Sequence, residues 1–149
     1  MILIQCIGNR YGGDDGFGPA VFDQLQQIEL PENVQVTEHW GEGTELMQHW
    51  EGKDTVILID AAHTGADPGT IHQFDALKDD IPKNLCIHAT HRFGVLEAIE
   101  LARSLAQLPE KMSLLAGEGA DFSPKQSLNP KLVDATADAV NLCLEEIQS

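Results

Sequence analysis

Two carboxylates and one imidazole stand at the ends of expected strands and loops, where an α/β protein places its functional groups. Asp15 follows a glycine-rich loop, Asp60 ends the most apolar run of the chain, and His91 precedes an expected helix. Oxygen and imidazole ligands suit divalent transition metals such as nickel, zinc or manganese. Two aspartates and one histidine are a weak motif on their own, because many surfaces carry such a set by chance. The sequence has no HExxH, CxxC, GxSxG or Walker motif, so these residues indicate a metal-associated site and no particular reaction.

The loop at residues 8–18 looks at first like a dinucleotide-binding turn. A pyrophosphate site needs open backbone N–H groups and little negative charge at the start of the following helix. Asp14 and Asp15 occupy that start, where they would repel phosphate. We therefore reject nucleotide binding. A cap needs only one side chain, so we interpret Asp14 as the helix cap and Asp15 as the functional carboxylate.

Each of the other two residues has an alternative, structural interpretation. A carboxylate at Asp60 is costly to bury unless it is paired, and it could instead cap a loop or bond to an Ala61–Ala62 turn. His91 could be a helix N-terminal residue with no further role. His88 lies within an expected strand, and we interpret it as structural.

The segments that must position these groups alternate between short apolar runs and helical repeats. Continuous apolar runs predict strands buried on both faces, as in a parallel sheet, and apolar residues at helical spacing predict helices. The expected strands are 2–7, 33–38, 56–59 (closed by Asp60), 70–74 at an edge, 84–89 and 111–116; the expected helices are 18–29, 43–50, 94–107 and one that Asn129 and Pro130 open and that runs to 147.

This order predicts one α/β domain spanning residues 1–149. It should have three layers, with a mainly parallel twisted sheet of about five strands between helices on both faces. Because sites in such sheets form at the carboxyl ends of the strands, we expect Asp15, Asp60 and His91 to face one cleft. We also expect them to lie close enough for one cation to contact all three.

Composition narrows the classes of partner. The chain carries 9 Lys and Arg against 24 Asp and Glu, a net charge of −15, which disfavours nucleic acids and anionic membranes. Solubility alone would also explain such an acidic surface. Three cysteines in apolar runs suggest reduced, buried thiols. The apolar opening run lacks basic residues and is too short for a signal peptide or membrane span, so we expect a cytoplasmic protein.

Four segments in the same order resemble the hydrogenase maturation endopeptidases. The family's opening Gly-Asn followed by paired acidic residues and a spaced Gly is matched by Gly8-Asn9 and Asp14 to Gly18. Its apolar strand ending in Asp is matched by 56–60, and its Ser/Thr-His-x-x-Gly by 90–94. Its stretch before the last helix is matched by 119–124 and 128–130. Lys125 stands where many relatives have Gly, so the loop at 121–128 should differ.

The resemblance implies an endopeptidase that removes the C-terminal extension of a nickel-loaded [NiFe]-hydrogenase large-subunit precursor. It implies that Asp15, Asp60 and His91 contact the metal and take part in catalysis, with Asp15 replacing the Glu of some relatives. The nickel would be supplied by the precursor, not held tightly by the protease, which we expect to act as a monomer. Two alternatives remain: a non-catalytic nickel-sensing chaperone and a metallohydrolase acting on a small molecule.

Overall fold

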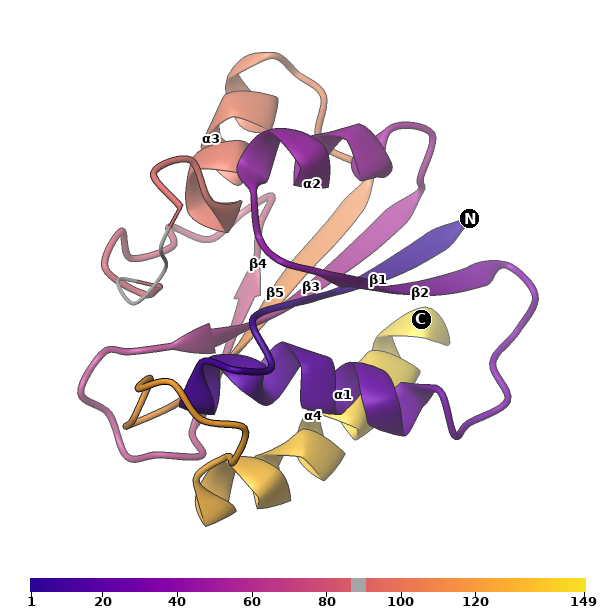
Figure 1. Ribbon diagram of the computed structural model, residues 1–149. Coiled ribbons are helices and arrows are strands. Elements are labelled where there is room, and N and C mark those ends of the chain that lie inside the picture. The colour runs from indigo at the N-terminus through magenta and orange to yellow at the C-terminus, as the bar shows by residue number, and fades with distance from the viewer. Residues whose placement is uncertain (87–90) are drawn as a thin grey trace.

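A five-stranded sheet in the order β2-β1-β3-β5-β4 forms the centre of the computed structural model, which describes residues 1–86 and 91–149 (Figure 1). Four strands are parallel and β4, at the edge, runs antiparallel to β5. The strands are β1 (Ile2–Ile7), β2 (Val34–His39), β3 (Thr55–Ala62), β4 (Ile71–Asp75) and β5 (Lys111–Glu118).

Helices cover both faces of the sheet. One face packs against α1 (Phe17–Leu25) and α4 (Pro130–Ile147), and the other against α2 (Gly43–Trp50) and α3 (Val95–Ser104) (Figure 1). A short 3-10 helix, η1 (Gly13–Gly16), precedes α1. Asn129 caps α4 as expected, through its side chain and the N–H of Lys131. No helix in the described part of the chain is long and apolar enough to cross a membrane.

The predicted α/β class, layers and mainly parallel sheet are confirmed, and one predicted strand is wrong. Residues 84–86 of the segment expected as strand 84–89 form a turn, and the rest of that segment, including His88, lies outside the described residues. Leu85 and Cys86 are nevertheless buried. A short apolar run marks burial but does not distinguish a strand from a buried turn.

The strand order leaves a crevice at one place along the sheet. β1 pairs with β2 on one side and with β3 on the other. The chain therefore runs from β1 to β2 in one direction and then passes back across β1 to reach β3. At such a switch point the connections diverge from the carboxyl ends of the two central strands. The space beyond the ends of β1 and β3 is therefore left uncovered.

A buried carboxylate at the end of β5 holds the loop that follows β3. Glu118 accepts hydrogen bonds from the hydroxyl of Thr64 (2.6 Å) and the N–H of Thr64 (2.8 Å), and lies 2.9 Å from Nε2 of His72 in β4. Burial, the largest influence, opposes ionisation. The hydrogen bonds from Thr64, His72 and Gly65 together outweigh it and hold the pKa of Glu118 below its usual value.

We predict that Glu118→Gln lowers the free energy of unfolding by roughly 1–3 kcal/mol at neutral pH, because it removes the charge from these hydrogen bonds. The lowered pKa means that the ionised carboxylate stabilises the fold above the pKa of an unfolded glutamate, about 4.3, and that this contribution is lost as pH falls through the folded value. Urea unfolding of the wild type and of Glu118→Gln should show a difference in the free energy of unfolding that narrows below about pH 4.

A matched control for this substitution is Glu110→Gln, which removes the same charge at an exposed position before β5. Its free energy of unfolding should stay within about 0.5 kcal/mol of the wild type. If the gap produced by Glu118→Gln is the same at every pH, the ionised carboxylate does not stabilise this loop.

Candidate functional site

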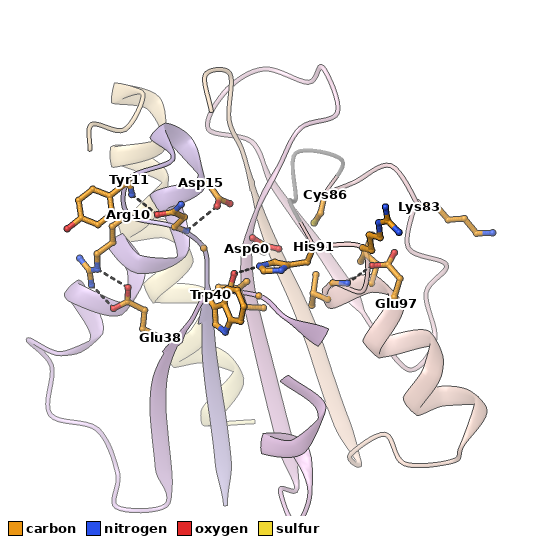
Figure 2. Close-up of a pocket in the computed structure, with 18 residues that line it drawn as sticks. Arg10, Tyr11, Asp15, Glu38, Trp40, Asp60, Lys83, Cys86, His91 and Glu97 are labelled. Atoms are coloured by element: carbon orange, nitrogen blue, oxygen red, sulfur yellow. Dashed lines mark hydrogen bonds and ion pairs between the residues drawn. The ribbon is translucent and has the colours of Figure 1, made fainter. Parts of the chain in front are cut away.

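A cavity of about 540 Å³ opens at the switch point between β1 and β3, and Asp15, Asp60 and His91 all line it. Figure 2 shows the three side chains reaching the cavity from different parts of the chain. Asp15 belongs to η1, Asp60 to β3, and His91 to the loop before α3. The expectation that they face one cleft is therefore met, and their chemical roles stay predictions.

The loop after β1 positions Asp15. Gly8 has φ +153°, and a Cβ at this residue would lie 2.1 Å from the carbonyl oxygen of Asp15, so only glycine fits. The N–H of Asn9 donates both to the carbonyl oxygen of Asp15 (3.2 Å) and to its carboxylate Oδ2 (3.1 Å). The loop thus folds back on Asp15 and holds a half-buried carboxylate at the cavity wall.

Asp60 lies inside β3, which continues for two residues beyond the predicted end of the strand. Its side chain is buried, and Oδ1 accepts the N–H of Ala61 at 2.8 Å, although Ala61 belongs to the strand and not to a turn. The thiol of Cys86 lies beside it in the cavity wall. Burial, followed by the charge of Asp60, raises the pKa of Cys86, which keeps this thiol protonated.

His91 is half-buried and held by Trp40, the residue that follows β2. Its Nε2 lies 3.1 Å from the carbonyl oxygen of Trp40 (Figure 2). A carbonyl can only accept a hydrogen bond, so Nε2 carries the hydrogen and Nδ1 of the neutral ring keeps its lone pair. Metal-ligating histidines usually donate their second ring N–H to a carbonyl or carboxylate in this way.

The interpretation of Asp14 as a helix cap is wrong. Asp14 is fully buried, and neither η1 nor α1 has a side-chain cap at its N-terminus. Its carboxylate instead accepts the N–H groups of Ala120 (2.7 Å), Asp121 (3.0 Å) and Asn129 (2.7 Å). Asp14 therefore anchors the segment between β5 and α4 to the first loop, a role that a local capping pattern does not reveal.

Arg10 is a further cavity residue that the sequence analysis did not identify. Its guanidinium donates to both carboxylate oxygens of Asp23 in α1 (2.7 and 2.8 Å) and to those of Glu38 in β2 (2.8 Å each). The hydrogen bonds that Arg10 donates to Asp23 and then to Glu38 raise the pKa of Arg10, and Arg10 lowers the pKa of Asp23. The three residues are far apart in sequence, so no local pattern predicts this contact.

The expectation that one cation could contact all three predicted ligands is not met by the side-chain positions. Among residues 1–86 and 91–149, no three side chains of His, Cys, Asp or Glu are grouped closely enough to hold an ion. Each predicted ligand is instead held by a different residue, Asp15 by Asn9, Asp60 by Ala61 and His91 by Trp40. The three cysteines are free and buried, as expected.

Comparisons with known proteins identify relatives of the chain among the hydrogenase maturation proteins. A family described as hydrogenase maturation protease matches residues 19–146. A putative hydrogenase maturation protease of Methanocaldococcus jannaschii is 30% identical over 98% of this chain and 93% of its own length. A hydrogenase expression/formation protein of Thiocapsa roseopersicina is 27% identical over 97% of this chain, which spans 66% of that protein.

Solved structures agree with this grouping. A hydrogenase 2 maturation peptidase from a Thaumarchaeota archaeon is 27% identical, with a TM-score of 0.73 over 98% of this chain and 97% of that one. The hydrogenase maturating endopeptidase HybD from E. coli shares the fold, with 20% identity and a TM-score of 0.80 over 99% and 91% of the two chains. With a family match over most of its length, the chain belongs to the hydrogenase maturation protease family.

Proposed function

We propose that this peptidase removes the C-terminal extension of a nickel-loaded [NiFe]-hydrogenase large-subunit precursor, and that Asp15, Asp60 and His91 contact the nickel of that precursor. The observation that carries the proposal is the cavity at the switch point, which two carboxylates and one imidazole line together. The family match supports the class of reaction, and the donor set supports the metal, because carboxylate and imidazole donors suit borderline divalent cations such as nickel.

In this proposal the protease tests whether the precursor carries its metal. Two carboxylates that line one cavity repel each other, and a divalent cation relieves that repulsion. A precursor that carries nickel would therefore gain an attraction that the metal-free precursor lacks. The two carboxylates would in this way distinguish the nickel-loaded precursor from the metal-free one. The three side chains are not grouped closely enough in the described residues to hold an ion by themselves, so binding of the precursor would have to bring them to the nickel. The precursor's cysteines supply the other ligands of that nickel.

The roles of the individual groups follow from their local contacts. Asp60 is buried in β3 with Oδ1 bonded to the N–H of Ala61, so its carboxylate is rigidly placed. His91 offers Nδ1, because Nε2 is engaged by the carbonyl of Trp40. The half-buried Asp15 supplies the second negative charge from the opposite side of the switch point. Nickel in the precursor would polarise the scissile carbonyl or an attacking water.

We predict that Asp15→Asn lowers the rate of precursor processing by about 100-fold, because it removes the charge but keeps the size of the side chain. The free energy of unfolding should change by less than about 1 kcal/mol, since the amide oxygen can still accept the N–H of Asn9. The measurements are a gel-shift assay of the nickel-loaded large subunit and a urea titration.

The neighbouring residue supplies the matched control. Asp14→Asn makes the same chemical change, but here the carboxylate accepts three backbone N–H groups, and the fold should lose roughly 2–3 kcal/mol. Normal processing by Asp15→Asn would contradict the assignment of Asp15.

A third prediction concerns metal dependence. Nickel-loaded precursor should be cleaved, and precursor prepared without nickel should stay intact. Treating the protease alone with a chelator and then removing the chelator should leave its activity on nickel-loaded precursor unchanged, because the metal comes with the substrate. Activity that is lost on this treatment and restored only by added metal would instead indicate a resident catalytic metal. Binding of the loaded precursor without cleavage would indicate a nickel-sensing chaperone.

A further inference from the structure

The imidazole of His91 is contacted by one residue in two ways. The carbonyl oxygen of Trp40 lies 3.1 Å from Nε2, and the indole ring packs edge-on against the imidazole, with centroids 4.6 Å apart and planes at 86°. The first contact selects which nitrogen carries the hydrogen, and the second limits rotation of the imidazole. Figure 2 shows Trp40 and His91 side by side at the cavity, close to Asp60.

Trp40 is itself held in place although its side chain is 59% exposed. Its indole N–H donates to Oε2 of Glu45 in the first turn of α2, at 2.6 Å. The same carboxylate oxygen lies 3.5 Å from Nε2 of His39. An exposed side chain loses rotational freedom when it is fixed in this way, and a short hydrogen bond to a carboxylate offsets that loss.

The backbone around Trp40 is fixed as well, which sets the direction of its carbonyl. Nδ1 of His39 accepts the N–H of Gly41 at 2.9 Å, across the Trp40 peptide. Gly41 has φ +108°, a conformation that favours glycine, and a Cβ there would lie 3.4 Å from the His91 ring. The N–H of Gly43 donates to the carbonyl of Phe93 at 2.7 Å, joining this loop to the loop that carries His91.

We propose that Trp40 and Glu45 are positioning residues that hold His91 in the Nε2–H tautomer and present its Nδ1 to the nickel of the precursor. The proposal rests on the proposed function for its substrate, but the tautomer can be measured without it. In the other tautomer, the lone pair of Nε2 would face the lone pairs of the Trp40 carbonyl. That repulsion disfavours the Nδ1–H tautomer, in which Nδ1 has no free lone pair with which to bind a metal.

The test combines a spectroscopic and a kinetic measurement on the full chain. Long-range ¹H–¹⁵N spectra at about pH 8, where an ordinary imidazole is neutral, distinguish a protonated ring nitrogen from a bare one. The chain has six histidines, and His91→Gln identifies the signals of His91. We expect the wild type to show a protonated Nε2 and a bare Nδ1. Cleavage of nickel-loaded precursor gives the accompanying rate.

Trp40→Ala keeps the backbone carbonyl of residue 40 but removes the indole that limits rotation of the imidazole, so the ring can turn away from that carbonyl. The two nitrogen signals of His91 should then move toward each other, and the rate of cleavage should fall 10- to 100-fold, the usual cost of removing a residue that orients a metal ligand. The variant should fold, because the indole is largely exposed. Glu45→Gln keeps an acceptor for the indole N–H, so both measurements should stay near wild type, whereas Glu45→Ala should shift both in the direction of Trp40→Ala.

The matched control is Tyr11→Ala, which removes another exposed aromatic side chain that lines the same cavity. It should leave the nitrogen signals of His91 unchanged. The proposal is overturned if the wild type carries its hydrogen on Nδ1, or if Trp40→Ala leaves the signals or the rate unaltered. A fall in rate with unaltered signals would mean that Trp40 contacts the precursor directly.

Discussion

The site depends on a constraint of topology, the parallel pairing of β1 with strands on both of its sides. In-register pairing places Ile7 beside His39 at the end of β2, and Cys6 beside Ile59, the residue before Asp60. The carboxyl ends of β1, β2 and β3 thereby lie together at one end of the sheet. Close packing of α1 on β1 reinforces the arrangement, because a Cβ at Gly18 would lie 2.1 Å from the carbonyl oxygen of Ile7. The strand order alone is enough to leave this crevice uncovered.

The acidic residues near the carboxyl ends of the strands divide into two kinds. Asp14 and Glu118 are fully buried, and each uses its carboxylate to hold a loop by backbone N–H groups. Asp15 and Asp60 line the cavity instead. Asp14 and Asp15 are adjacent, yet one fixes the segment before α4 and the other faces the crevice. Charge-assisted hydrogen bonds thus build the walls that present the remaining carboxylates.

The spacing of apolar residues predicted the α/β class, the edge position of β4 and most element boundaries. It could do so because the buried faces of a strand or helix determine which of its positions are apolar. It failed at Leu85 and Cys86, where burial occurs in a turn. The cleft itself was predictable, since strand ends converge in a parallel sheet. The contacts of Arg10, Asp14 and Trp40 were not, because each joins residues that only the tertiary fold brings together. The sequence pattern located the candidate site, whereas hydrogen bonds between residues far apart in the chain hold His91 and the loops around the cavity.

The central claim is that protease side chains enter the environment of the precursor's nickel. Nickel K-edge X-ray absorption tests it most directly, on nickel-loaded precursor mixed with protease and frozen before cleavage. We predict additional oxygen and nitrogen neighbours around nickel when the wild-type protease is present, and fewer of them with Asp15→Asn or His91→Gln. A nickel spectrum that is the same with wild-type protease, with either variant and with no protease would contradict this account.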